Sequence, residues 1–252
     1  MRHARTPLPA LVLFLLAGLA GLVRVLPASG QAPPATRSFA ERDALQNGWL
    51  KQRFHQAAST WDEDPGRVRL ARAVAEQMLR RLGQTSALDV LDFGCGTGLL
   101  TLALEPHVRS VTGADSSAGM LRVLEQKVQA LRLTSVTPYL LDDAHPLASA
   151  GSFDLVASSM TLHHVRDLPV LFSDLRSLLR IGGRVALADL DREDGSFHSP
   201  EISDVHHQGF ERRDIRLLLS EAGFDGLEDA TAFVHRRNDR DYPVFLITGR
   251  VR

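Results

Sequence analysis

The sequence predicts an α/β fold in which a doubly wound parallel sheet is covered by helices on both faces. Three observations lead to this fold class. Short apolar runs alternate with helix-like segments after Gly83, as in a sheet with crossover helices. A glycine-rich loop follows the first of these runs, at residues 94–98. The length of 252 residues suits a single domain with a sizeable core.

Residues 1–40 differ in composition from the rest, and the predicted domain covers residues 41–252. The first 40 residues contain four arginines and no acidic residue, and residues 11–23 read LVLFLLAGLAGLV. This run is short for a membrane span, which needs about 20 residues. Membrane association through residues 8–26, a signal peptide, an organelle transit peptide and a translation start further along the chain all stay open. Residues 31–38 (QAPPATRS) form a polar, Pro-rich linker.

An amphipathic helix is predicted over residues 67–83. Leu70, Val74, Met78 and Leu82 recur at intervals of four, and Gly83 supplies a stop. The preceding residues 54–65 are polar apart from two aromatic residues, Phe54 and Trp61. These two are either anchors in the core or part of a lid over a ligand.

The rest of the chain supplies the strands and their crossover helices. Apolar runs predict strands at residues 87–93, 110–114, 136–141, 153–158 and 184–188, and helix-like patterns cover residues 118–131 and 168–179. A later helix at residues 212–222 ends before the turn at Gly223, and residues 242–251 (YPVFLITGRV) form a last strand.

The segment VLDFGCGTG at residues 90–98 contains the predicted binding loop. Gly94, Gly96 and Gly98 allow a tight turn and a close approach of the backbone to a ligand. Asp92 precedes the loop and suits a cationic group, whereas the dinucleotide spacing GxGxxG serves a pyrophosphate. About 20 residues further along the chain, Asp115 ends the second strand, where a carboxylate can accept both ribose hydroxyls. Asp115 could instead cap the helix that follows.

These residues resemble the class I S-adenosylmethionine (SAM)-dependent methyltransferases, in particular the bacterial small-molecule branch, over about residues 54–251. The resemblance implies a Rossmann-like, seven-stranded sheet, mostly parallel, whose antiparallel last strand lies between the fifth and sixth. It implies that the glycine loop binds SAM, that Asp115 binds the ribose, and that Asp143 lies near the adenine. Asp143 could also be a turn residue. Ser159, at the end of the fourth strand, is counted with the cofactor-binding residues.

Methyl transfer to a small-molecule acceptor needs alignment and, where the acceptor carries a proton, a base. We expect His164 and His207 to be catalytic, because neutral imidazole can take a proton near pH 7. Each has a histidine neighbour, and the other candidates are His163, His206, Ser158, Asp189 and Asp191. Aromatic residues make up 6% of the chain, too few to indicate a ring-containing acceptor.

Other classes of protein fit the sequence less well. A net charge of −1 gives no reason to expect a nucleic-acid partner. The single cysteine, Cys95, excludes an internal disulfide and a cysteine zinc site. No metal is expected either, because adjacent histidines such as His206 and His207 point in different directions.

Two alternatives to the enzyme stay open: a membrane-tethered, non-catalytic SAM-fold binding or assembly protein, and an NAD(P)-dependent oxidoreductase. The oxidoreductase is disfavoured because the chain has neither a GxGxxG loop nor a YxxxK pair. A SAM enzyme needs a compartment that supplies SAM, so we expect a cytoplasmic protein, with membrane anchoring or organelle targeting as alternatives. The sequence does not predict an oligomeric state.

Overall fold

The computed structural model describes residues 48–199, 202, 205–237 and 239–252. All of these belong to one of the two units into which the chain divides, Arg37–Arg252, whereas the other unit, Met1–Thr36, lies outside the described residues. The predicted anchor and linker over residues 1–40 therefore also lie outside them. No helix in the described part of the chain is both long and apolar enough to cross a membrane.

Helices and strands alternate along the described chain as the sequence predicts. In order, the elements are α2 (Gly48–Ala57), α3 (Pro65–Leu82), β1 (Asp89–Phe93), α4 (Leu99–Leu104), β2 (Ser110–Asp115), α5 (Ala118–Leu131), β3 (Val136–Leu140), β4 (Phe153–Ser159), α6 (Leu168–Ser177), β5 (Leu179–Leu190), α7 (Arg212–Glu221), β6 (Phe224–Arg237) and β7 (Arg240–Val251). Two short 3-10 helices concern the site: η1 (Ala58–Glu63) and η4 (Leu162–His164).

The strands form one seven-stranded sheet in the order β3-β2-β1-β4-β5-β7-β6. Strands β1 to β5 pair in parallel, and β7 runs antiparallel to both of its neighbours. The predicted Rossmann-like sheet, with its antiparallel last strand between the fifth and sixth, is confirmed. The strand order reverses between β1 and β4, and in open α/β sheets such a reversal leaves room for a ligand beyond the strand ends.

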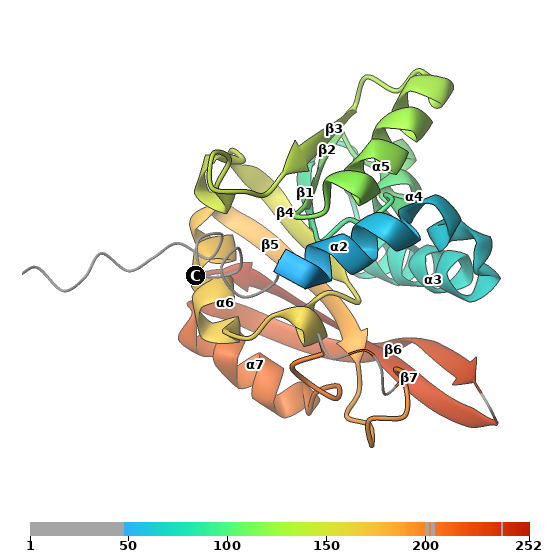
Figure 1. The fold of residues 1–252 in the computed structure, drawn as a ribbon. Coiled ribbons are helices and arrows are strands. Elements are labelled where there is room, and N and C mark those ends of the chain that lie inside the picture. Colours follow the sequence, from blue (N-terminus) through green and yellow to red (C-terminus); the bar gives the residue numbers. More distant parts are fainter. Residues whose placement is uncertain (1–47, 200–201, 203–204, 238) are drawn as a thin grey trace, which may run out of the picture. The chain divides into compact units, whose positions relative to one another are not determined.

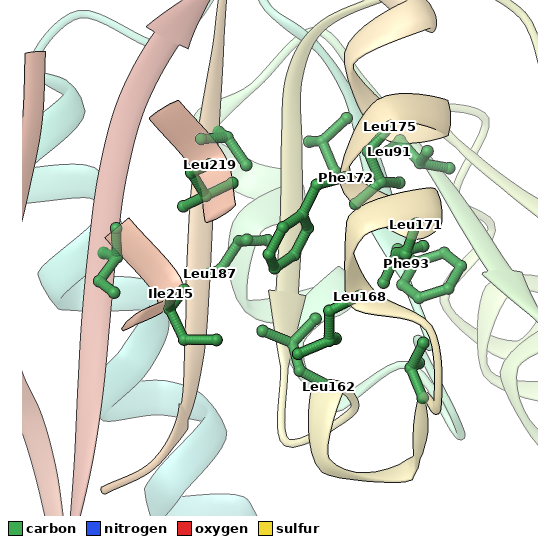
Figure 2. Packing of buried hydrophobic residues seen from close by; sticks show 14 of the residues in the cluster. Leu91, Phe93, Leu162, Leu168, Leu171, Phe172, Leu175, Leu187, Ile215 and Leu219 are labelled. Carbon is green, nitrogen blue, oxygen red and sulfur yellow. The ribbon is translucent and has the colours of Figure 1, made fainter. Parts of the chain in front are cut away.

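Helices cover both faces of the sheet, because neighbouring residues of each inner strand point to opposite sides. In β1, Leu91 packs into a cluster with residues of α6 and α7, whereas Val90 packs into another cluster with residues of α3 and α4. Figure 1 shows α3, α4 and α5 on one side of the sheet and α6 and α7 on the other. Figure 2 shows the first cluster from close by, with side chains of α6 (Leu168, Leu171, Phe172 and Leu175) and α7 (Ile215 and Leu219) gathered around Leu187 of β5.

Local sequence signals account for the start and end of α3, the helix that precedes the first strand. The carboxylate of Asp64 accepts a hydrogen bond from the Gly66 amide at 2.7 Å and caps α3, whose first residue is Pro65. The predicted stripe of Leu70, Val74, Met78 and Leu82 is buried along its whole length. Gly83 ends the helix with φ of +70°, a value that favours glycine.

Two features of the sheet differ from the prediction. Strand β6 is not predicted by the sequence, because only Phe224 and Ala232 are buried among its 14 residues and the apolar alternation is lost. Strand β5 begins at Leu179, which the sequence places in a helix, and it runs through the glycine pair Gly182-Gly183 to Leu190.

Candidate active site

A cavity of about 430 Å³ lies beyond the C-terminal ends of β1, β2 and β4. Residues from each of these ends line it: Phe93 and the glycine loop after β1, Asp115 at the end of β2, and Ser159 at the end of β4. The cavity thus occupies the place where the strand order reverses, which is the usual ligand site of an open α/β sheet. We take it as the candidate active site and divide its walls into the glycine-loop end and the histidine end.

The glycine loop has a conformation that side chains other than glycine rarely adopt. Gly94, Gly96 and Gly98 have φ of +72°, +56° and +83°. A Cβ atom added at Gly94 would lie 2.3 Å from the Thr161 side chain, and one at Gly98 would lie 2.4 Å from the Leu124 side chain. Gly94 and Gly96 line the cavity, whereas Gly98 packs behind the loop at the start of α4. Gly98 therefore shapes the loop and does not line the cavity.

Asp92 is a buried carboxylate beside this loop. It lines the cavity, is 1% exposed, and accepts a hydrogen bond from the Thr101 hydroxyl at 2.6 Å. Burial, together with the nearby charge of Asp115, raises the pKa of Asp92 to about 7. A cationic ligand group at this place would compensate the buried charge.

Asp115 fixes the loop and faces the cavity at the same time. One carboxylate oxygen accepts from the Gly96 amide and the other from the Ser117 amide, both at 2.8 Å. The N-cap of α5 is Ser117, whose hydroxyl accepts from the Met120 amide at 3.3 Å, so Asp115 is not the helix cap. Asp115 also lines the cavity, so its carboxylate lies where a ligand hydroxyl could reach it.

The structure separates the two remaining cofactor candidates. Ser159 lines the cavity. Asp143 is exposed and is not among the lining residues, and the adjacent Asp142 closes the turn by accepting hydrogen bonds from the amides of Ala144 (3.0 Å) and His145 (2.8 Å). The assignment of Asp143 to the adenine stays a prediction.

Three histidines gather at the other end of the cavity. The ring centroids of His163 and His164 lie 4.1 Å apart, and that of His198 lies 5.0 Å from His163. His163 comes from η4 after β4 and is buried, and its Nδ1 donates to Oδ1 of Asp189 on β5 at 2.7 Å. His164, which the sequence predicts as catalytic, lines the cavity and packs edge-on against Phe54 at 5.4 Å.

His198 is a lining residue to which the sequence does not point. Its Nε2 is buried and has no hydrogen-bond partner within the described part of the chain. Burial and the charge of neighbouring groups, first among them His163, lower the pKa of His198 to about 4, so the ring is neutral at pH 7. It therefore brings an unused nitrogen to the cavity wall.

Two other candidates lie outside the cavity lining. Nε2 of His207 donates to the carbonyl oxygen of Val165 at 2.9 Å, and its ring packs against Phe210. Asp191 forms two hydrogen bonds with Arg212, at 2.7 and 2.6 Å. The structure thus gives both side chains structural partners and does not bring them into the site, and a catalytic role for His207 stays an untested prediction.

The segment before α3 covers part of the cavity. Phe54 and Trp61 line it and pack edge-on at 5.5 Å, and neither belongs to the buried core, in line with the lid alternative. Asp62 ties this segment to the glycine loop, since it accepts from the Thr97 hydroxyl at 2.5 Å and pairs with Lys127. Lys127 also donates to the carbonyl oxygen of Thr97 at 2.7 Å.

Several other lining residues are missed by the sequence analysis, namely Arg53, Arg67, Phe197, His235 and Arg237. They lie on α2, on α3, in the segment after β5 and near the end of β6, and no local motif marks any of them. With Phe54 and Trp61, Phe197 brings three aromatic rings to the cavity. Although aromatic residues are few in the chain, this cavity collects three of them, and whether the acceptor contains a ring stays untested.

Comparison with known proteins gives a consistent result. A family model described as a methyltransferase domain matches residues 49–229. An uncharacterized methyltransferase of Schizosaccharomyces pombe is 33% identical over 159 residues, which cover 57% of this chain and 55% of that protein. Nocamycin O-methyltransferase of Saccharothrix syringae is 33% identical over 123 residues, covering 48% of this chain and 44% of that protein. The chain spans about half the length of these curated relatives.

The fold also matches solved structures. The crystal structure of a SAM dependent methyltransferase from Aquifex aeolicus aligns with a TM-score of 0.57 at 19% sequence identity, covering 80% of this chain and 98% of that chain. At this level of identity the likeness shows a common fold, and it agrees with the seven-stranded sheet described above.

Proposed function

The chain belongs to the methyltransferase-domain family, and on that premise we propose that it transfers a methyl group from SAM to a small-molecule acceptor. The observation that carries the proposal is the single cavity that joins the glycine loop, Asp92 and Asp115 at one end to three histidines at the other. One end has the groups to hold a nucleoside joined to an amino acid, and the other has groups that can handle a proton.

The residues at the glycine-loop end fit SAM. Asp92 is buried, and no cationic side chain pairs with it among the described residues, so the ammonium group of the methionine moiety would compensate its charge. In this proposal Asp115, which lines the same cavity, accepts from the ribose hydroxyls. Gly94 keeps its part of the wall free of a side chain, because a Cβ there would collide with Thr161.

In this proposal the chain binds SAM and the acceptor, orients them toward each other, and excludes water from the cavity. When bound, SAM supplies an electrophilic methyl group on a positively charged sulfur. Asp92 and Asp115 hold the two polar ends of the ligand, and the segment with Phe54 and Trp61 covers the cavity and shields it from solvent. Positioning two reactants in this way accounts for much of the rate gain in a direct displacement.

Titration calorimetry with SAM tests this proposal. We expect the full chain to bind SAM, and Asp115→Ala to weaken binding roughly 10- to 100-fold, because a hydrogen bond to a charged group contributes about 1.5–3 kcal/mol. Asp241→Ala is the matched control, since Asp241 lies on β7 outside the cavity lining. A wild-type chain that does not bind SAM would overturn the proposed function. Full affinity in Asp115→Ala would overturn the ribose assignment alone.

Location and partners form a separate proposal. We propose that the enzyme works in the cytoplasm, because a SAM enzyme needs a compartment that supplies SAM, with anchoring through residues 8–26 or organelle targeting as the alternatives. The acceptor is proposed to be a small molecule because the histidines line a cavity of about 430 Å³, a volume typical of small-molecule sites. One of the relatives is named an O-methyltransferase, which is compatible with a hydroxyl acceptor.

A further inference from the structure

We propose that Asp92 makes the cavity selective for ligands that carry an ammonium group, by exchanging a proton for that group. In mildly acidic solution the Asp92 carboxyl of the ligand-free protein holds a proton, and an ammonium group bound in the cavity releases this proton to solvent. The inference rests on the proposed function and deepens it, because it predicts which ligands bind and how their affinity depends on pH. The argument uses the burial of Asp92, its hydrogen bonds and the charges around it.

The fold places Asp92 where water cannot stabilise a full charge. Asp92 lies on β1, which pairs with β2 on one side and with β4 on the other, and the residue is 1% exposed. It nevertheless lines the cavity, so a ligand group can come close to its carboxyl while bulk water does not. Burial favours the neutral form of a carboxyl, whereas an opposite charge within about 4–6 Å favours the ionised form. The exchange therefore needs proximity and not direct contact.

The hydrogen bonds of Asp92 compensate its charge only in part. Within the described part of the chain its one hydrogen-bonding partner is Thr101 of α4, whose hydroxyl lies 2.6 Å from a carboxylate oxygen and whose backbone also favours the ionised form. Asp115, by contrast, is only half-buried and accepts from the amides of Gly96 and Ser117, both at 2.8 Å. Solvent and amide donors both favour the ionised form of a carboxyl. Of these two neighbouring carboxyls, Asp92 is therefore the one that holds the proton.

The charges around the glycine loop do not offset the burial of Asp92. Burial raises the pKa of Asp92 to about 7, the hydrogen bonds from Thr101 oppose this rise, and the charge of Asp115 adds to it. The Cys95 thiol of the loop is neutral, because burial and then the charges of Asp115 and Asp92 raise its pKa well above the usual value. The nearby ammonium of Lys127 on α5 pairs with Asp62 of η1.

The cavity also has acidic and basic side chains outside the glycine-loop end. Arg67 of α3 lies 3.7 Å from Asp64, the residue that caps this helix. The other ionisable lining residues are the three histidines of the histidine end, Arg53, His235 and Arg237. None of these side chains, acidic or basic, is among the groups that shift the pKa of Asp92. The charge that ionises Asp92 must therefore arrive with the ligand.

The exchange balances without any further reactant. The O–H bond of the Asp92 carboxyl breaks, its electron pair stays on oxygen, and the proton passes to the buffer, while the ammonium keeps its own hydrogens. A ligand that needs the ionised form binds with an apparent Kd equal to the intrinsic Kd divided by the ionised fraction. Because the pKa of Asp92 is about 7, the ionised fraction rises with pH below that value, and the affinity should rise with it by up to about 10-fold per pH unit.

Calorimetric titration of the wild-type full chain tests the exchange without any methyl acceptor. At pH 6, in two buffers that differ in ionisation enthalpy, S-adenosylhomocysteine should release about one proton. S-adenosyl-3-thiopropylamine, which keeps the amino group and lacks the carboxylate, should release it too, whereas 5′-methylthioadenosine, which lacks both groups, should release none. Between pH 5.5 and pH 6.5 the affinity for S-adenosylhomocysteine should rise roughly 5- to 10-fold, and that for methylthioadenosine by less than about 2-fold.

Two variants test whether the proton belongs to Asp92. In Asp92→Asn the side chain cannot ionise, so S-adenosylhomocysteine should bind without proton release and, at pH 7.5, roughly 10-fold or more weakly than to wild type. Its affinity should no longer follow pH, whereas methylthioadenosine should bind as it does to wild type. Thr101→Val removes a hydroxyl that favours the ionised form, so the rise of affinity should move to higher pH. Asp241→Asn is the matched control, because Asp241 is exposed and lies outside the cavity lining.

The outcomes separate this inference from the proposed function. A wild-type chain that binds neither SAM nor S-adenosylhomocysteine would overturn both. Binding of S-adenosylhomocysteine without proton release would overturn the exchange and leave the proposed function standing. Proton release that persists in Asp92→Asn would belong to another group, and equal release by methylthioadenosine would show that the ammonium is not its cause. Either of these last two results contradicts the selectivity proposed for Asp92.

Discussion

Asp92 suits the binding of a cationic ligand, but its buried carboxylate lowers the stability of the ligand-free protein when it is ionised. Its carboxylate is 1% exposed, and one protein hydroxyl, that of Thr101, hydrogen-bonds to it at 2.6 Å. Burial raises its pKa from 3.8 to about 7, so the folded protein holds this proton more tightly than the unfolded chain does. The stability that this proton contributes is complete below about pH 4 and is lost as the pH rises through about 7. A site shaped for a cationic ligand thus weakens the ligand-free fold at neutral pH and above.

Replacing Asp92 with asparagine should therefore stabilise the ligand-free protein in alkaline but not in acidic solution. The amide keeps the shape of the side chain and cannot ionise, so the gain over wild type should grow between pH 5 and pH 8.5, by on the order of 2–3 kcal/mol. Urea unfolding at several pH values measures it. Asp241→Asn, an exposed carboxylate, should follow the wild-type pH profile. If the free energy of unfolding of Asp92→Asn and of wild type changed with pH in parallel, ionisation of Asp92 would not destabilise the folded protein.

The segment of α2 and η1 is the element that connects the cavity with the glycine loop. Its residues Phe54 and Trp61 line the cavity, and Asp62 hydrogen-bonds to Thr97 of the glycine loop and forms an ion pair with Lys127. Among its described side chains, those of residues 53–63, only Ala58 belongs to the buried core. We expect residues 53–63 to open without unfolding of the domain, because their described side chains bury little apolar surface.

Removing the contacts of Asp62 with Thr97 and Lys127 should speed ligand release more than it destabilises the fold. Asp62→Ala removes the hydrogen bond to Thr97 and the ion pair with Lys127, and exposed or half-exposed pairs of this kind contribute about 1 kcal/mol or less. We expect the dissociation rate of S-adenosylhomocysteine to rise roughly 3- to 10-fold, as read by stopped-flow fluorescence of the tryptophans, with little change in melting temperature. Glu63→Ala, an exposed neighbour, is the control. Equal dissociation rates in the two variants would show that the contacts of Asp62 do not slow ligand release.

The elements differ in how far the sequence predicts them. Strands β1 to β5 and helices α3 and α5 are predictable because their apolar residues are buried in periodic patterns. Strand β6 is not, since its outer position leaves most of its side chains exposed. At the site, Asp92 and Asp115 are predicted by their position next to a glycine loop.

The histidine end is harder to predict. Adjacent residues such as His163 and His164 cannot be told apart until η4 and Asp189 orient them. His198 and Arg237 reach the cavity only through the folded sheet, from segments with no local motif. Local pattern therefore predicts the cofactor end of the cavity, and tertiary packing decides the acceptor end.

On the scale of the whole molecule, the cavity exists only when distant segments are assembled. Its walls come from α2, the glycine loop, the ends of β2 and β4, the segment after β5 and the end of β6. The unfolded chain therefore has no such site, and any ligand of the cavity must stabilise the folded state by mass action. All of these walls lie within residues 53–237, and hence within the predicted domain of residues 41–252.

A chain that begins at residue 41 should accordingly respond to the cofactor product as the full chain does. At a concentration of S-adenosylhomocysteine about 100 times its Kd, the stabilisation is about 2.7 kcal/mol. For a domain of this size that raises the melting temperature by roughly 5–11 °C. Scanning calorimetry of both chains measures the increment, and the Asp115→Ala variant at the same ligand concentration should show a smaller one. If residues 8–26 are an anchor, only the full chain should float with phospholipid vesicles. An increment lost on removing residues 1–40 would mean that the site needs them, which would contradict the predicted domain boundary.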